Sequence, residues 1–377
     1  SAALGQPVIV APVSKRPTVA DVAELAGVHR STAARALNPE TSGMLTPETV
    51  TRVLDAAHTL NYTPNTIARG LRTNRSLTIG ALIPDLTNPL FPPIVRGIEE
   101  AIAPHGYTAL VVNSDNDPER EEANFHALLA RQVDGFIVAT ARHHDPVLVE
   151  AARRGVAVVL VNRGTADRRF PLVAGDDRQG VLDAVAHLAE LGHRRIAHLA
   201  GPKGVSTSML RASAFREACA RHGIDEADAP MVSCVGFTQV GGLTGMRQLL
   251  EWSGSVVDKR SAAAVGGRSG AAVGGARSGA VTAVLAGNDL IALGALRALT
   301  EAGLRCPADV SVVGFNDMPF ADAFAPALTT VRVPHRLMGV EAGRLLLEQI
   351  QAGSPSAKTV LLPCELMARD STAPPGK

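Results

Sequence analysis

Most of this chain alternates short apolar runs with stretches of helical periodicity, and the alternation occurs twice. After Ser76 the runs LTIGALI, YTALVVN, GFIVA and VAVVLV are separated by segments that predict helices, two of them from about Phe91 and Glu119. The rhythm starts again near Arg195 with RIAHLA, VTAVLAG and VSVVGF. Because strands separated by helices form parallel sheets covered on both faces, the pattern predicts two similar α/β lobes. Ligands of such sheets bind at the carboxyl ends of strands, so two facing lobes predict a cleft.

Composition excludes several other classes of protein. With 377 residues, 46% apolar and 19% charged, the chain is long enough for two or three domains and too apolar for wholesale disorder. No apolar run reaches about 18 residues, which argues against a membrane-spanning helix. Residues 1–14 lack the basic region of a secretory signal, so export is not expected. The cysteines have no CxxC spacing and indicate reduced thiols in a cytoplasm, without a metal site or cofactor; they are Cys219, Cys234, Cys306 and Cys364.

The first part of the chain predicts a small bundle of helices. Thr18 and Asp21 match a capping box before a short apolar helix, and Gly27 allows a tight turn into a second helix at about 29–37. This spacing is typical of a helix-turn-helix. Thr46 and Pro47 form the cap and first turn of a third helix. Residues 15–75 contain eight bases and five acids, a modest surplus of +3.

Several motifs carry a resemblance to a known family. They are TVADVA (18–23), AGV (26–28), NYTPN (61–65) and ARGLR (68–72), together with Thr32, Arg35, Leu37 and Asn38. In order and spacing they resemble the lactose-repressor (LacI/GalR) family of bacterial transcription regulators, over about residues 15–370. The resemblance implies an all-α helix-turn-helix head joined to an α/β periplasmic-binding-protein-like effector domain with two Rossmann-like lobes. It also implies a cytoplasmic, homodimeric repressor, not an enzyme, that binds a palindromic operator in double-stranded DNA and a small-molecule effector.

The resemblance assigns DNA contacts to the head and to a hinge helix. In the family the second helix lies in the major groove, and the base-reading positions match Arg30, Ser31 and Arg35. Leu71 matches a leucine that wedges between bases in the minor groove. The expected DNA-binding residues are Thr18, Arg30, Ser31, Thr32, Arg35, Asn38, Tyr62, Asn65, Arg69 and Leu71. His29 stands where the family usually has serine and is expected to be a poorer helix cap.

The resemblance also assigns effector contacts at successive strand ends. The expected residues are Asp85, Leu90, Phe91, Asn162, Arg163, Arg211, Phe237, Asn288 and Asn316. Phe237 is suited to stacking on a sugar face, and Arg211 is the strongest polar candidate. The family often has aspartate where Asn162 and Asn316 stand. The loss of two negative charges favours an anionic effector, such as a sugar acid or a phosphorylated sugar.

Domain boundaries follow from the same alignment. The head is expected at 15–62, the hinge at 63–75 and the effector domain at 76–370. Lobe one is expected at 76–175 and 334–355, and lobe two at 176–333 and 356–370. A Gly/Ala-rich stretch at 261–279 contains a near-duplication and predicts a flexible insertion. Residues 1–14 and 371–377 are expected to be loose.

Two other functions compete with the regulator. Residues 76–370 alone would fit a solute-binding protein, which the head and the missing signal oppose. An α/β enzyme is a third interpretation, but no GxSxG, GxxxxGK[ST] or HExxH motif occurs. A salt-dependent shift of duplex DNA separates the regulator from both.

Overall fold

The computed structural model describes residues 17–63, 75–252, 280–353 and 357–376, and the chain divides after Ser76 into two units. Our expectations for the hinge residues Asn65, Arg69 and Leu71, for the 261–279 insertion and for residues 1–14 therefore lie outside the described residues. None of the described helices is both long and apolar enough to cross a lipid bilayer.

The first unit is a small helical head. Its described helices are α1 (Val19–Leu25), α2 (Arg30–Ala36), α3 (Pro39–Ser42) and α4 (Pro47–Thr59). Thr18 closes the predicted capping box with Asp21, and the Thr46 side chain caps α4, so both predicted helix starts are confirmed. Gly27 has a φ of +63°, which lets the chain turn sharply between α1 and α2.

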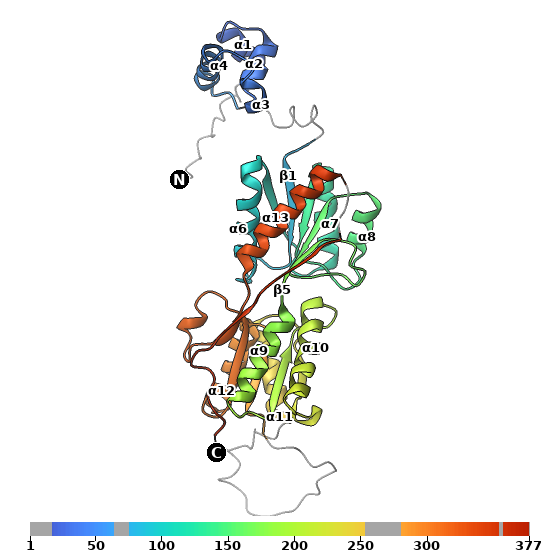
Figure 1. Ribbon diagram of the computed structural model, residues 1–377, viewed down its shortest axis with the longest axis vertical. Helices are drawn as coiled ribbons and strands as arrows, with labels where there is room; N and C mark the ends of the chain where they lie inside the picture. The colour runs from blue at the N-terminus through green and yellow to red at the C-terminus, as the bar shows by residue number, and fades with distance from the viewer. Residues whose placement is uncertain (1–16, 64–74, 253–279, 354–356, 377) are drawn as a thin grey trace, which may run out of the picture. The chain divides into compact units, whose positions relative to one another are not determined.

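Lobe one of the second unit contains a parallel sheet of strand order β11-β5-β4-β3-β1-β2. The strands are β1 (Thr78–Ile83), β2 (Thr108–Asn113), β3 (Gly135–Val138), β4 (Val158–Val161), β5 (Leu172–Gly175) and β11 (Thr359–Leu362). Its helices are α6 (Phe91–Ile102), α7 (Pro118–Ala130), α8 (Pro146–Arg153) and α13 (His335–Ala352), with a 3-10 turn η1 (Ala103–His105). Helices α6 and α13 pack together on one face, whereas α7 and α8 cover the other (Figure 1).

Lobe two repeats this arrangement with strand order β12-β10-β9-β8-β6-β7, in which only the β10–β12 pair among the described pairs is antiparallel. The strands are β6 (Ile196–Ala200), β7 (Met231–Ser233), β8 (Ala283–Ala286), β9 (Ser311–Asn316), β10 (Thr329–Arg332) and β12 (Glu365–Met367). The helices are α9 (Asp177–Glu190), α10 (Ser206–Arg221), α11 (Gln239–Trp252) and α12 (Asp289–Glu301), with 3-10 turns η2 (Glu226–Asp228) and η3 (Ala321–Ala323). The predicted two-lobe α/β architecture is confirmed.

One expected lobe boundary is wrong. We expected residues 356–370 in lobe two, but β11 pairs in parallel with β5 at the edge of lobe one, and only β12 joins lobe two. The described chain thus passes between the lobes after β5, after β10 and between β11 and β12. The physical reason is that β5 would otherwise leave an unpaired edge, which β11 covers before the chain crosses.

A second correction concerns the end of the chain. Residues 371–373 are not loose, because they form hydrogen bonds with lobe two. The Ser371 hydroxyl, fully buried, donates to the Val312 carbonyl oxygen (2.6 Å) and accepts from the Thr329 amide (2.8 Å). His193 Nε2 lies 2.9 Å from the Ala373 carbonyl oxygen. These partners give the segment a fixed position that its polar composition did not predict.

Candidate functional site

The head is held by small residues that let short helices approach closely. Val22, Ala33 and Val53, one from each main helix, are fully buried at its centre. Because alanine and valine fill little volume, the core brings α2 against both α1 and α4 and leaves the opposite side of α2 free. The helix-turn-helix therefore has a defined outer face.

That outer face presents the predicted base-reading residues. Arg30, Ser31 and Arg35 are exposed on α2, the first two in its opening turn. His29 caps this helix, since its Nδ1 accepts from the Ser31 amide and lies 2.8 Å from the Ser31 hydroxyl. We expected His29 to be a poorer cap than serine, but its imidazole does cap α2, and it also fixes the position of Ser31.

The other expected DNA contacts in the head have more varied surroundings. The Thr18 hydroxyl donates to Asp21 Oδ2 (2.7 Å) within the capping box. Thr32 and Asn38 are half-buried at the middle and end of α2, and Tyr62 packs against the head core. Only Thr18 of these four is exposed.

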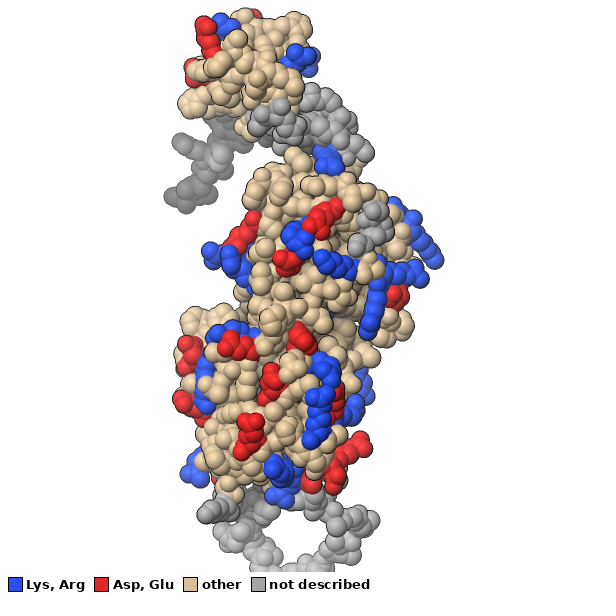
Figure 2. Space-filling view, in the orientation of Figure 1, with Lys and Arg blue, Asp and Glu red and all other residues tan. Residues whose placement is uncertain are grey.

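Positive charge is scarce in the folded part of the head. Residues 17–63 contain three arginines and five acids, which leaves −2, so the surplus in 15–75 comes from its flanks. On the face of the lobes drawn in Figure 2, basic and acidic side chains are intermixed rather than separated by sign. Many form ion pairs, such as Arg178 with Glu217. That face therefore lacks the one-signed patch typical of a nucleic-acid surface.

Two hollows lie where the lobes meet. The larger, of about 500 Å³, is lined by four of the expected effector residues, Asp85, Phe91, Arg163 and Phe237. The smaller, of about 210 Å³, is lined by three others, Leu90, Asn288 and Asn316. Asn88 lines both hollows. Segments that follow β1, β4, β7 and β8, together with the last residue of β9, supply these residues, so these seven of the residues that the resemblance assigned to strand ends lie around the two hollows.

The larger hollow also contains charged residues that the sequence reasoning missed. Besides Arg163 it is lined by Glu121, Arg142 and Lys203. Glu121 accepts from the Thr140 hydroxyl (2.5 Å) and lies 3.5 Å from Arg142 Nη2, while burial raises its pKa. Burial lowers the pKa of Arg163 to about 10, so this guanidinium is still charged at neutral pH. Arg142 lies just beyond the end of β3, so the strand-end rule, applied to every strand, would have found it.

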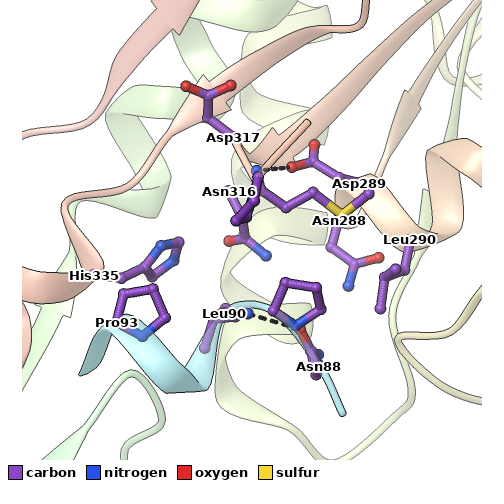
Figure 3. A pocket seen from close by; sticks show the side chains of 12 residues that line it. Asn88, Leu90, Pro93, Asn288, Asp289, Leu290, Asn316, Asp317 and His335 are labelled. Atoms are coloured by element: carbon purple, nitrogen blue, oxygen red, sulfur yellow. Dashed lines mark hydrogen bonds between the residues drawn. The ribbon is translucent and has the colours of Figure 1, made fainter. Parts of the chain in front are cut away.

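Polar side chains from both lobes line the smaller hollow, among them Asn88, Asn288, Asn316 and His335 (Figure 3). Asn316 Oδ1 and His335 Nε2 are buried there, and neither atom has a hydrogen-bond partner in the described structure. Asn288 instead caps α12, because its side chain accepts from the Ile291 amide (2.8 Å). Asp289 accepts from the Thr330 hydroxyl (2.5 Å) and the Met318 amide (2.7 Å), and burial raises its pKa to about 7.

Two expected effector residues do not join the others. Among the residues described as lining the two hollows, neither Asn162 nor Arg211 occurs. Arg211 is 3% exposed; its Nε donates to Asp177 Oδ2 (2.9 Å), its Nη1 donates to the Gly287 carbonyl oxygen (2.6 Å), and its guanidinium lies 3.8 Å from the centre of the Phe315 ring. Arg211 thus ties α9, α10 and the end of β8 together inside lobe two.

No group of three or more His, Cys, Asp or Glu side chains in the described residues is arranged to hold a metal ion. All four cysteines are free thiols, and burial raises the pKa of Cys234 to about 11.

Three protein-family profiles match the chain. They are the bacterial regulatory proteins of the lacI family over residues 18–65, the periplasmic binding proteins and sugar binding domain of the LacI family over 76–251, and a periplasmic binding protein-like domain over 185–372.

Curated relatives match along almost their whole length. The HTH-type transcriptional repressor CytR of Escherichia coli (strain K12) is 31% identical over 356 residues, 94% of this chain and 96% of that protein. The HTH-type transcriptional regulator CelR of Thermobifida fusca is 32% identical over 364 residues, 95% of this chain and 98% of that protein. These relatives are regulators of transcription, not enzymes.

Solved structures share the fold. The Lac repressor dimer bound to operator and the anti-inducer ONPF has a TM-score of 0.78 and 30% identity, covering 95% of this chain and 100% of that one. The CelR–cellobiose complex has a TM-score of 0.65 and 31% identity, covering 94% and 100%.

Proposed function

Because the chain belongs to the LacI family of bacterial regulatory proteins, we propose that it represses transcription in the cytoplasm by binding a palindromic operator as a homodimer. A small effector in the interlobe hollows controls this binding. The observation that carries the proposal is the exposure of Arg30, Ser31 and Arg35 on one helix of a capped helix-turn-helix.

The exposed residues of α2 have the chemistry that base reading requires. An arginine donates two parallel hydrogen bonds to guanine in the major groove, and a serine hydroxyl bonds a base or a phosphate. Thr18, Thr32, Asn38 and Tyr62 supply further contacts at the edge of this surface. Since two heads read two half-sites, the operator is two-fold symmetric.

The hinge supplies the second part of DNA binding in this proposal. Asn65 and Arg69 contact the backbone, and Leu71 wedges between bases in the minor groove. The net charge of −2 in residues 17–63 supports this division, because the general attraction to phosphates must then come from flanking cations such as Lys15, Arg69 and Arg72.

The effector is a small sugar-like molecule with negative charge. Phe91 and Phe237 offer ring faces in the larger hollow, and Asp85 accepts hydrogen bonds from hydroxyl groups. The same hollow is lined by three cations, Arg142, Arg163 and Lys203, against two acids, Asp85 and Glu121. Structures of relatives with bound cellobiose and bound ribose support the sugar-like class.

The test is selection of binding sites from random duplex DNA. The wild-type chain should select a two-fold symmetric sequence, and Arg35→Ala should relax base choice at one position in each half-site, at about 1–3 kcal/mol per half-site. Arg52→Ala, which removes an exposed arginine from α4 instead of α2, is the matched control. If the wild-type chain selects no sequence, the repressor function is overturned. If Arg35→Ala keeps the wild-type base preference, only the base-reading role of Arg35 is wrong.

A further inference from the structure

Three side chains of lobe one that line the larger hollow each contain a polar atom without a partner among the described residues, and we refer to these three side chains as its wall. Arg142 Nε, Arg163 Nε and Ser114 Oγ are buried, and none of them has a hydrogen-bond partner among the described residues. All three residues line the hollow. Arg163 is 7% exposed and Ser114 is 2% exposed, so water has little access to either.

Other contacts of the two arginines show why their Nε–H groups have no partner within the protein. Arg163 Nη1 donates to Asn116 Oδ1 (3.2 Å), which holds the guanidinium in place and leaves its Nε–H unused. Arg142 Nη2 lies 3.5 Å from Glu121 Oε2 and 3.8 Å from Asp145 Oδ1. Both arginines are therefore positioned by protein contacts that spare their Nε–H groups.

Every unused group in this wall donates. An arginine Nε–H has no acceptor capacity, and a serine hydroxyl donates its proton when the ligand group is an anion. A buried donor without an acceptor costs about 1–3 kcal/mol, more for a charged group, so the wall is complementary to an acceptor-only group with negative charge.

A neighbouring acid, Glu121, limits the negative charge that the bound ligand group can have. Glu121 lines the same hollow, and its two oxygens face Thr140 and Arg142. A ligand with two negative charges would be repelled by this carboxylate, whereas a single charge shared between two guanidinium groups is balanced. A carboxylate has about four acceptor positions on its two oxygens, so three donors satisfy most of them, whereas they would leave about half of the positions on the three terminal oxygens of a phosphate unsatisfied.

We propose that Arg142, Arg163 and Ser114 form a carboxylate-binding subsite, and that the effector of this protein is a sugar acid whose carboxylate occupies it. The proposal rests on the proposed function, because it places the acidic group of the effector within the cleft. The sugar ring then extends toward Phe91 and Phe237, which line the same hollow.

The experiment compares sugars that differ only in the charged group. The full chain is titrated by calorimetry with D-glucuronate and D-galacturonate, each beside its neutral parent sugar, D-glucose or D-galactose, and beside the 6-phosphate of that sugar. At least one acid should bind about tenfold or more tightly than its parent, a difference of about 1.4 kcal/mol.

Substitutions in the wall test whether its side chains cause the tighter binding of the acid. Arg142→Met and Ser114→Ala should each reduce the acid-to-parent affinity ratio to within about threefold, and Arg142→Lys, which keeps the charge without the Nε–H, should give an intermediate ratio. Arg153→Met, which removes an exposed arginine from α8 outside the hollow, should leave the ratio unchanged. Melting temperatures show that each variant is folded, and Ser114→Ala serves alone if Arg142→Met does not fold.

Each contrary result has a definite meaning. Equal binding of acid and parent, tighter binding of the phosphate, or a preference that survives Arg142→Met and Ser114→Ala overturns the carboxylate subsite and leaves the sugar-responsive repressor standing. If no compound of any class binds while the selected operator is still bound, both the subsite and the proposed effector class are wrong.

Discussion

At the residue scale, two asparagines that we expected to share a role at strand ends have different surroundings. Asn162 follows β4 with a φ of +66°, and Asn316 ends β9 with a φ of +113°. Asparagine tolerates such positive φ values better than most residues. Only Asn316 lines a described hollow, where its Oδ1 is free to accept from a ligand. We therefore expect the difference from the aspartate that the family often has to affect ligand binding at Asn316 and not at Asn162.

His335 predicts a measurable pH dependence of stability. Burial lowers its pKa to about 3, so it is neutral in the folded state, whereas in the unfolded chain it has the ordinary value near 6.5. Its contribution to stability is complete above pH 6.5 and is lost as the pH falls toward 3. The wild-type free energy of unfolding should fall between pH 7 and pH 5 as the unfolded chain takes up a proton at His335. His335→Phe, which removes no hydrogen bond at Nε2 among the described contacts, should make that fall smaller by about 2 kcal/mol.

Urea unfolding of both chains near pH 7 and near pH 5 measures this difference. Asp289 does not obscure it, because its raised pKa is present in both chains. An identical pH dependence of the two proteins would show that His335 is not the buried titrating group.

At the element scale, glycines set the contact between the two helices that cover one face of lobe one. A Cβ added to Gly339 of α13 would lie 2.0 Å from the Ile94 carbonyl oxygen, and one added to Gly97 of α6 would lie 2.0 Å from that of Arg336. Since both obstacles are backbone atoms, the helices cannot make room by changing a rotamer. This contact therefore fixes the amino-terminal part of α13 against α6.

Gly339→Ala should therefore destabilise the effector unit by about 1–3 kcal/mol, even though alanine favours an isolated helix by about 1 kcal/mol. Gly236→Ala is the control, because an added Cβ there meets nothing closer than 3.6 Å. Thermal unfolding of the two variants checks the prediction, which fails if Gly339→Ala melts at the wild-type temperature.

At the scale of the whole molecule, the lobes are joined by short crossings, and the hollows between them draw residues from both. Arg163 belongs to lobe one and Phe237 to lobe two, yet both line the larger hollow. A ligand that contacts both lobes favours one arrangement of them. Under the proposed function we expect effector and operator to alter each other's affinity by the same factor, typically about 5- to 150-fold.

Arg163→Ala should abolish this coupling. Operator binding is titrated with and without an effector identified by calorimetry. Without effector, the variant should bind the operator with wild-type affinity, because the head is unchanged. With effector, its operator affinity should stay the same at the concentration that changes the operator affinity of the wild type. A normal response would show that Arg163 does not bind the effector.

Much of this protein was determined by local sequence pattern alone. Capping residues and helical periodicity predicted the head, and alternating apolar runs predicted both sheets, because these signals depend on neighbours a few residues apart. The alternating pattern also predicted a cleft at the carboxyl ends of the strands, and the family resemblance assigned Asp85, Phe91, Arg163 and Phe237 to it. Tertiary structure alone decided three other features. It placed β11 in lobe one, since a free strand edge can pair with a distant segment. It directed Arg211 to Asp177 and Gly287 inside lobe two, and it left Arg142, Arg163 and Ser114 with unused donors. Contacts between residues far apart in the sequence set each of these outcomes, and no local pattern records them.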